Sequence, residues 1–242
     1  RCVNVWVASA GYGLISIEER IVAYSATFSN PHPDSVILDD CNTANADQKC
    51  AWWNELVACD WPRERPHSVT DLAAEAPNDP LIIVGSRNYL FSLYDDLLHA
   101  REEMKNQDLF SIISAGTDQL YELTDSLVPA NARLQHYVGG VRRSLNIRLA
   151  RYALQATTRG SATLHRLSNL FETLLKESPE LPTYDRTPMT DAAITEFILQ
   201  KMNSKLPATH TRLLRELRDS GKACEQKRFR NLFREAQEAI HG

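Results

Sequence analysis

Three apolar runs in the first half of the chain each end in a turn of small residues. They are "VNVWVASAG" at 3–11, "LIIVGSRNYL" at 81–90 and "LFSIISAGT" at 109–117. Continuous apolar runs of this length are typical of strands covered on both faces of a sheet. An amphipathic helical stretch separates the second run from the third, which indicates a βαβ unit. The pattern predicts an α/β fold with a central, mostly parallel sheet flanked by helices.

The small-residue turns predict where a ligand would bind. Ligands of parallel sheets bind outside the carboxyl ends of the strands, so we expect all three turns on one edge. The first turn, "SAGYG" at 9–13, has two glycines. Glycine either lets a ligand approach the backbone or permits a positive φ in a tight turn. Tyr12 and Tyr24 offer aromatic faces of the kind that hold a planar base, although the glycines could serve only to close the turn.

The second half of the chain is predicted to be helical. Apolar residues recur at helical spacing in 139–155, 160–177 and 189–206, and Thr190 is placed to cap the last of these. The pattern therefore predicts a helical region after the sheet. The expected division of the chain is an α/β base-pocket domain at 1–125, an arginine-rich helical region at 126–205 and a C-terminal basic helical hairpin at 206–242.

The last 37 residues, 206–242, have the pattern of two helices joined by a glycine turn at 219–221. Leucines form the apolar face of the first helix, and phenylalanines that of the second. The opposite face of the second helix carries Lys227, Arg230 and Arg234 at spacings of three and four. The arrangement is that of a helix-turn-helix, or of an ordinary helical hairpin with a solvated charged face.

Charge is distributed unevenly along the chain, although the net charge is only −4. Residues 1–125 contain 8 basic and 20 acidic side chains, whereas 126–171 contain seven arginines and no acid. Residues 205–242 contain 9 basic and 5 acidic side chains. This asymmetry predicts a surface for an anionic partner, with nucleic acid first. The alternative is that the arginines pair with the acidic first half.

Several kinds of chemistry are absent from the sequence. There is no zinc-protease motif, P-loop or nucleophile elbow, and the five cysteines form no C-x-x-C pair. We therefore expect no metal and no cofactor, and a reduced, cytoplasmic protein. No apolar run is long enough to span a membrane, so no membrane partner is expected. The candidate catalytic carboxylates are Glu19, Asp39 and Asp40. Glu19 could instead belong to a solvated first turn of a helix, and Asp39 and Asp40 could simply end a strand.

The first turn carries a family resemblance. "SAGYGL" at 9–14 and "ERIVAYSAT" at 19–27 resemble the S-x-x-Y/H-G-L and (E/R)-x-I-x-x-Y-(D/S)-x-T signature of the YaaA-like peroxide-stress family. That family is more distantly similar to the uracil-DNA-glycosylase-like superfamily. The resemblance covers about residues 3–120. It departs from the glycosylase pattern because the loop has no Asp or Asn beside the glycine and the His-Pro-Ser turn is missing.

The resemblance implies a pocket for a flipped base. The loop Ser9–Gly13 would approach the base, Tyr24 or Phe28 would stack on it, Asn88 would read its edge, and the turn from Ser114 would clamp it. The base-pocket residues expected in this way are Ser9, Gly11, Tyr12, Gly13, Tyr24, Phe28, Asn88, Ser114 and Gly116. Because the loop lacks an acid, a catalytic carboxylate must come from elsewhere in the chain.

These observations lead to the hypothesis of a DNA glycosylase-like protein. It would bind DNA, flip a modified base and cleave its N-glycosidic bond, as the related bacterial antiphage glycosylases do. The alternatives are a non-catalytic DNA-binding stress or defence protein of the same fold, and an enzyme that modifies tRNA or nucleotide bases. The expected DNA-binding residues are Gly139, Gly140, Arg142, Arg143, Arg148, Arg151, Lys227, Arg230 and Arg234. Arg133 is expected to hold a phosphate together with the arginines of 142–151.

Overall fold

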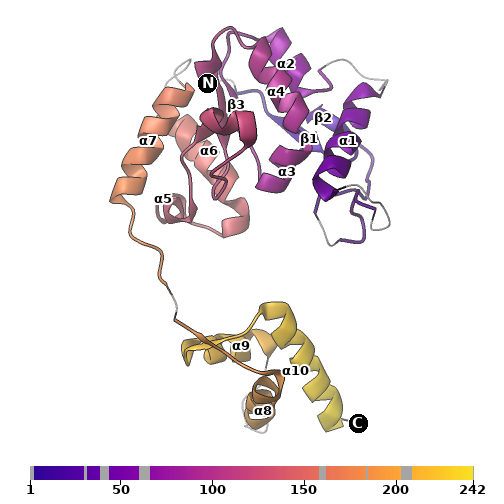
Figure 1. The fold of residues 1–242 in the computed structure, drawn as a ribbon, viewed down its shortest axis with the longest axis vertical. Coiled ribbons are helices and arrows are strands. Elements are labelled where there is room, and N and C mark those ends of the chain that lie inside the picture. The colour runs from indigo at the N-terminus through magenta and orange to yellow at the C-terminus, as the bar shows by residue number, and fades with distance from the viewer. Residues whose placement is uncertain are drawn as a thin grey trace. The chain divides into compact units, whose positions relative to one another are not determined.

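The chain folds into two compact units, which comprise Arg1–Glu180 and Leu181–Gly242 (Figure 1). The computed structural model describes residues 3–29, 32–38, 44–59, 66–157, 162–183, 185–202 and 209–241. The first unit is mixed α/β and the second is mainly helical. This division differs from the three expected ranges, because the helices of 126–177 pack within the first unit.

A three-stranded parallel sheet lies at the centre of the first unit. Its order is β3 (Leu81–Val84), β4 (Phe110–Ile113) and β5 (Leu127–Val128), with Leu81 opposite Phe110. All four residues of β4 are buried, as expected for a central strand covered on both faces. The connection from β3 to β4 contains α3 (Arg87–Ser92) and α4 (Tyr94–Glu103), which are separated at Leu93. The predicted parallel βαβ unit is therefore confirmed.

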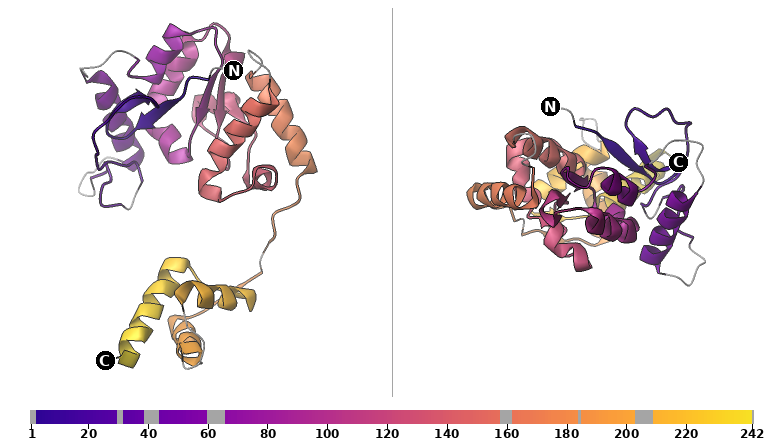
Figure 2. Two further views of the ribbon diagram at one scale, coloured as in Figure 1. Left: turned by 180° about the vertical axis from the view of Figure 1, so that it is seen from behind. Right: turned by 90° about the horizontal axis from the view of Figure 1, so that it is seen from above.

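The first strand does not join this sheet, contrary to expectation. β1 (Trp6–Ser9) pairs antiparallel with β2 (Gly13–Ser16) in a separate two-stranded sheet (Figure 2). Only three residues connect the strands, and Gly13 has a φ of 71°, so the chain reverses at once and pairs with itself. The expectation that all three small-residue turns share one sheet edge is therefore wrong for the first of them.

The helices of the N-terminal half are joined by one buried carboxylate. The side chain of Asp96, on α4, accepts hydrogen bonds from Trp53 Nε1 at 3.0 Å and from the backbone N–H groups of Val69 and Thr70 at 2.9 Å each. Trp53 belongs to α1 (Asn45–Ala58), and Val69 begins α2 (Val69–Glu75). Asp96 thus connects three helices, and its partners compensate for burial of its charge.

Three helices that follow β5 pack against the parallel sheet of the first unit. They are α5 (Gln135–Val138), α6 (Leu145–Ala156) and α7 (Leu164–Glu177). Leu149 and Phe171 pack with Ile113 of the sheet in one core cluster. Burying their apolar faces there leaves the polar faces of α6 and α7 outside. Short 3-10 helices occur at Gln107–Leu109, Tyr121–Ser126, Ala132–Leu134 and Arg142–Ser144.

The second unit contains α8 (Asp191–Met202), α9 (His210–Asp219) and α10 (Gln226–His241). A short parallel pair, β6 (Thr187–Pro188) and β7 (Lys222–Ala223), accompanies them. The three helices share one core, formed by Ile194, Ile198, Leu213, Leu214, Leu217, Cys224, Phe229, Phe233 and Ala236. The connection between α9 and α10 includes β7 and runs from Ser220 to Glu225, so it is longer than the three or four residues of a helix-turn-helix turn.

Candidate functional site

The turn between β1 and β2 is built around a close approach of Tyr24. A Cβ atom placed on Gly11 would lie 2.4 Å from Cδ2 of the Tyr24 ring. The Ser9 hydroxyl donates to the Tyr24 hydroxyl oxygen at 2.7 Å and accepts from the Gly11 N–H at 3.2 Å. Tyr12 meets the Tyr24 ring edge to face, with centroids 5.2 Å apart. Gly11 is therefore required for close contact, whereas Gly13 supplies the positive φ.

A tryptophan of α1 holds the same turn from another direction. Trp52 Nε1 donates to the carbonyl oxygen of Ala10 at 2.8 Å, and the Trp52 side chain remains partly exposed. The turn is thus attached to α1 as well as to Tyr24. Sequence reasoning missed this contact, because Trp52 and Ala10 are 42 positions apart and no local pattern connects them.

The two predicted stacking residues have different surroundings. Tyr24 is 44% exposed, so part of its ring is open to a ligand. Phe28 is fully buried and packs edge to face on Tyr89, with ring centroids 5.2 Å apart. Burial, and then the proximity of Tyr24, raises the pKa of Tyr89 above its usual value. Phe28 therefore supports the aromatic cluster from within, and Tyr24 is the residue that presents a face.

The turns after β3 and β4 are joined by one side chain of α6. Asn146 Nδ2 donates to the carbonyl oxygen of Gly85 at 2.6 Å, and Asn146 Oδ1 accepts from the N–H of Ala115 at 2.9 Å. The hydroxyls of Ser114 and Thr117 are hydrogen bonded to each other at 2.9 Å and buried. The second and third expected turns therefore lie together at the carboxyl end of the parallel sheet, and Asn146 connects them.

Asn146 was missed by sequence reasoning, although the sequence contains a signal for it. The buried residues of α6 are Leu145, Leu149, Ala150 and Ala153, and Asn146 falls on the same helical face. A polar residue in the middle of an apolar face needs hydrogen-bond partners, which indicates a specific contact. The neighbouring candidate Asn88 is exposed on α3, and its side-chain amide forms no hydrogen bond within the described ranges.

The remaining residue of the third turn, Gly116, has a φ of 82°, and its N–H donates to the carbonyl oxygen of Ala130 at 3.1 Å. No atom lies within 4 Å of a Cβ built there. Gly116 is therefore needed for its backbone conformation, and the space beside it is open.

Four exposed arginines follow these turns along the chain. They are Arg142 and Arg143 of the 3-10 helix, and Arg148 and Arg151 of α6. None of them forms an ion pair within the part of the chain that the structure describes. Their positive charge is therefore not neutralised by the acids of the described first half, and the group is available to an anion.

The glycine pair before these arginines has left-handed backbone, with φ of 61° at Gly139 and 71° at Gly140. The guanidinium of Arg148 lies directly over Gly140, where an added Cβ would be 2.4 Å from its Cζ atom. Arg148 Nε also donates to the Ser144 hydroxyl at 3.0 Å. The glycine pair thus allows Arg148 to fold back on the loop, which holds this guanidinium in one place.

Arg133 differs from the other arginines of the segment because it is engaged within the protein. Its guanidinium donates to the carbonyl oxygens of Ser178 and Pro179 and pairs with Glu180 at 3.2 Å. These contacts attach the end of the first unit to the 3-10 helix Ala132–Leu134, which precedes α5. Arg133 therefore has a structural role and is not grouped with the exposed arginines.

The candidate catalytic carboxylates are not brought to the turns by the described backbone. Asp39 and Asp40 lie outside the described residues. Glu19 follows Ser16, which pairs with Trp6 at the open end of the hairpin, opposite the Ser9–Gly13 turn. Three residues of strand separate these ends, which is about 10 Å at the usual rise. The turn itself carries no acid, as the sequence already indicated.

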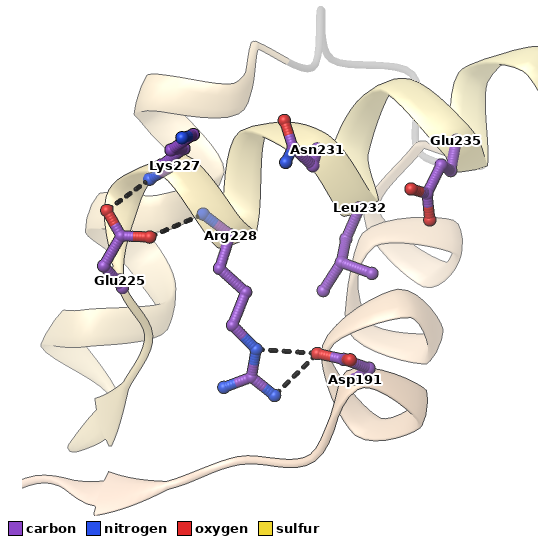
Figure 3. A pocket seen from close by; sticks show the side chains of 7 residues that line it. All are labelled: Asp191, Glu225, Lys227, Arg228, Asn231, Leu232 and Glu235. Carbon is purple, nitrogen blue, oxygen red and sulfur yellow. Dashed lines mark hydrogen bonds and ion pairs between the residues drawn. The ribbon is translucent and has the colours of Figure 1, made fainter. Parts of the chain in front are cut away.

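The basic stripe of the second unit is exposed. Lys227, Arg230 and Arg234 lie on the solvent side of α10, and Arg234 approaches Glu238 at 4.0 Å. Beside the stripe, an open depression of about 410 Å³ is lined by residues of both charges (Figure 3). The lining residues are Asp191, Glu225, Lys227, Arg228, Asn231, Leu232 and Glu235.

The charged groups of this depression are largely satisfied by one another. Arg228 binds Asp191 through Nε at 2.7 Å and through Nη2 at 2.6 Å (Figure 3). The Glu225 carboxylate accepts the backbone N–H groups of Lys227 and Arg228 at 2.8 Å each, which holds its pKa below the usual value. Glu225 thus occupies the anion position at the start of α10, and the depression is part of the fold of this unit.

Comparisons with known proteins identify no relative: no family model, no curated protein and no solved structure matches the chain. Within the described ranges, no group of three or more His, Cys, Asp or Glu side chains is placed to hold a metal ion. Among the same residues, no helix has both the length and the apolar character needed to cross a membrane.

Proposed function

We propose that the chain is a DNA glycosylase-like protein with a uracil-DNA-glycosylase-like fold, which acts on a modified base in antiphage defence. It would hold DNA with the exposed arginines, flip a nucleotide toward the strand-end turns and hydrolyse its N-glycosidic bond. The C-terminal unit would add a second basic surface, with α10 contacting phosphates through Lys227, Arg230 and Arg234.

One observation carries this proposal: Asn146 connects an arginine-bearing helix to two strand-end turns. Its hydrogen bonds to Gly85 and Ala115 place the start of α6 against the sheet edge where α/β proteins bind ligands. Arg148 and Arg151 lie on the same helix. A nucleic acid whose phosphates contact these arginines would therefore pass close to the turns, as base flipping requires.

The chemistry assigned to the site follows from bond cleavage at a sugar. Breaking an N-glycosidic bond builds positive charge on the deoxyribose. A nearby carboxylate can stabilise this charge, or it can activate the water molecule that attacks the sugar. Tyr24 would stack on the extruded base through its exposed face, and the side-chain amide of Asn88 would hydrogen bond with its edge. The carboxylate would come from Asp39, Asp40 or Glu19.

A second candidate function is DNA binding without catalysis. It is favoured by the position of Glu19 at the open end of the hairpin and by the absence of any acid in the Ser9–Gly13 turn. In that case the arginines and the turns would hold DNA for stress response or defence, with no bond broken. The RNA- or nucleotide-modifying alternative draws no specific support from the geometry.

The deciding experiment incubates the full chain with phage DNA that contains modified cytosines and with matched unmodified DNA. Abasic sites are then counted with an aldehyde-reactive probe. We expect abasic sites in modified DNA only, and their loss in at least one of Glu19→Gln, Asp39→Asn and Asp40→Asn. Binding with intact DNA on every substrate would establish the non-catalytic function instead. Competition by tRNA but not by duplex DNA would contradict both.

A further inference from the structure

One buried cation of the first unit has no assigned role. The side chain of Lys49, on α1, is only 7% exposed. It forms no hydrogen bond or ion pair with any residue in the described part of the chain. Lysine is almost never this buried unless it is paired, so the unpartnered amine requires an explanation.

Lys49 lies one helical turn before the two residues of α1 that contact the hairpin turn and α4. Lys49, Trp53 and Leu56 are the buried residues of α1, and they follow one another at helical spacing on a single face. Trp52, three residues after Lys49, donates to Ala10 in the turn, and Trp53 donates to Asp96 of α4. Lys49 therefore lies on the part of α1 that faces the region between the turn and the helices after β3.

The amine is covered without being completely enclosed. The fully enclosed, unpartnered side-chain atoms among the described residues are Arg101 Nε and Ser111 Oγ, and Lys49 Nζ is not one of them. The side chain is thus mostly buried, while the nitrogen keeps some contact with solvent. Such an arrangement suits a reactive amine, although it is also found in a lysine whose stem merely covers apolar surface.

Burial makes the charged form of this amine less favourable than that of an exposed lysine. Burial lowers the pKa of Lys49 below its usual value, and no carboxylate of the described residues offsets that shift. A lysine of this kind is a better nucleophile than an exposed one, because more of it is unprotonated near neutral pH. By contrast, Lys201 of the second unit is paired with Glu216.

We propose that Lys49 forms an imine with the C1′ aldehyde of an abasic deoxyribose. The inference rests on the proposed glycosylase function, because base excision would produce that aldehyde beside the turn. It adds a second activity to the site, cleavage of the DNA strand at the abasic position. The substrate class is an open-chain 2-deoxyribose within a DNA strand.

The chemistry needs no further reagent. The Lys49 nitrogen adds to C1′, and the carbinolamine loses water to leave a protonated imine. Loss of a C2′ proton to water then drives cleavage of the C3′–O bond, which releases the 3′ phosphate as the leaving group. Hydrolysis of the unsaturated imine returns the amine. No oxidant, reductant or metal takes part, and each bond formed is matched by one broken.

The test uses the full chain and a duplex with a preformed abasic site, so that it does not depend on base excision. Sodium borohydride traps the imine as a secondary amine, which peptide mass spectrometry assigns to a residue. We expect a covalent protein–DNA adduct on Lys49, and strand cleavage when borohydride is omitted. In Lys49→Arg and Lys49→Met, the adduct is expected to fall ~50-fold or more, because neither side chain supplies a nucleophilic amine.

Lys176, exposed on α7, provides the matched control. Lys176→Met should trap as much DNA as the unaltered chain. Circular dichroism of the two Lys49 variants checks that they fold, and Lys49→Met preserves most of the buried stem. No adduct from the unaltered chain would overturn the proposal, as would an adduct that persists undiminished in folded Lys49 variants.

The same series separates this inference from the proposed function. A Lys49 adduct on preformed abasic DNA, with no excision from modified DNA, would contradict the glycosylase and support the imine. Excision from modified DNA without any adduct would support the glycosylase and contradict the imine. Both proposals would fail if neither abasic sites nor adducts formed.

Discussion

Asn146 donates to the carbonyl oxygen of Gly85 at 2.6 Å and so connects α6 to the end of β3. Its other amide atom accepts from Ala115 after β4. We expect Asn146→Ala to lower the free energy of unfolding by about 1–3 kcal/mol, because two backbone groups lose their partner. Chemical denaturation of the full chain measures the change. Gln155→Ala, at an exposed position of the same helix, should change stability by less than about 0.5 kcal/mol.

The Asn146→Asp variant distinguishes a role of Asn146 in positioning the turns from a role in stabilising the fold. An aspartate keeps the acceptor for the Ala115 N–H but removes the donor to Gly85. If Asn146 positions the turns relative to the arginines, this variant should lower the rate of base excision while DNA affinity stays near that of the unaltered chain. Excision kinetics under saturating DNA measure the effect. Equal losses in affinity and rate would indicate a general loss of structure.

The effects of substitutions at Gly11 and Tyr24 on the free energy of unfolding should be coupled. Gly11→Ala places a methyl group 2.4 Å from the Tyr24 ring, so the ring or the turn must move. We expect destabilisation of about 1–3 kcal/mol. In a Tyr24→Ala background the clash is absent, so the same substitution should cost less than about 0.5 kcal/mol. A double-mutant cycle by thermal or chemical unfolding measures this, and additive effects would contradict the close approach.

Substitution of the exposed arginines should weaken DNA binding without lowering the stability of the fold. Arg142→Ala with Arg143→Ala should weaken DNA binding and reduce the slope of log affinity against log salt by about 1.8, at about 0.9 for each phosphate that is no longer neutralised. Fluorescence anisotropy over a salt series measures the slope. Arg133→Ala is the contrasting variant, because its guanidinium binds Ser178, Pro179 and Glu180. It should reduce stability and leave the salt slope unchanged.

The carboxylate of Glu225, which caps the start of α10, predicts that the stability of the second unit depends on pH. Hydrogen bonds from the N–H groups of Lys227 and then Arg228 hold the pKa of Glu225 below its usual value. A lowered pKa means that Glu225 contributes stability above its unfolded-state pKa, near about 4.3, and that this contribution is lost as the pH falls through the folded-state value. The second unit should therefore become less stable on acidification.

Amide exchange of α10 between about pH 3 and pH 7, corrected for the intrinsic rates, measures this dependence. Glu225→Gln should lower protection at neutral pH and weaken its decline toward acid. Glu235→Gln, on the same helix, is the control, because Glu235 forms no hydrogen bond or ion pair within the described residues. Identical pH profiles for Glu225→Gln and the unaltered chain would contradict the assignment.

Much of the fold could be predicted from the sequence, because periodicity is a local property. The apolar runs at 81–84 and 110–113 became parallel strands, and the helix capped by Thr190 begins at the next residue, with the Thr190 hydroxyl accepting from Ala193. The apolar faces that the sequence pattern predicts for α9 and α10 are buried together in the core of the second unit. These features could be predicted because they depend on residues close in sequence, within one helical turn or within a few residues of a strand.

The candidate site could be predicted only in part. Sequence reasoning singled out the three small-residue turns, and two of them lie together. It assigned the first turn to the same sheet, because an apolar run does not reveal which strand it pairs with. It also grouped Arg133 with the exposed arginines, since charge along the chain does not show whether a guanidinium is already engaged.

By itself, the sequence determined the order of strands and helices, the apolar faces that form the cores and the arginine segment without acids. Only the tertiary structure decided that β1 returns on itself, that Tyr24 rests on Gly11 and that Asn146 connects two turns. It also decided that Lys49 is buried without a partner among the described residues. The physical reason is distance along the chain: Gly85 and Asn146 are 61 positions apart, and such contacts depend on packing between elements that local propensity does not specify.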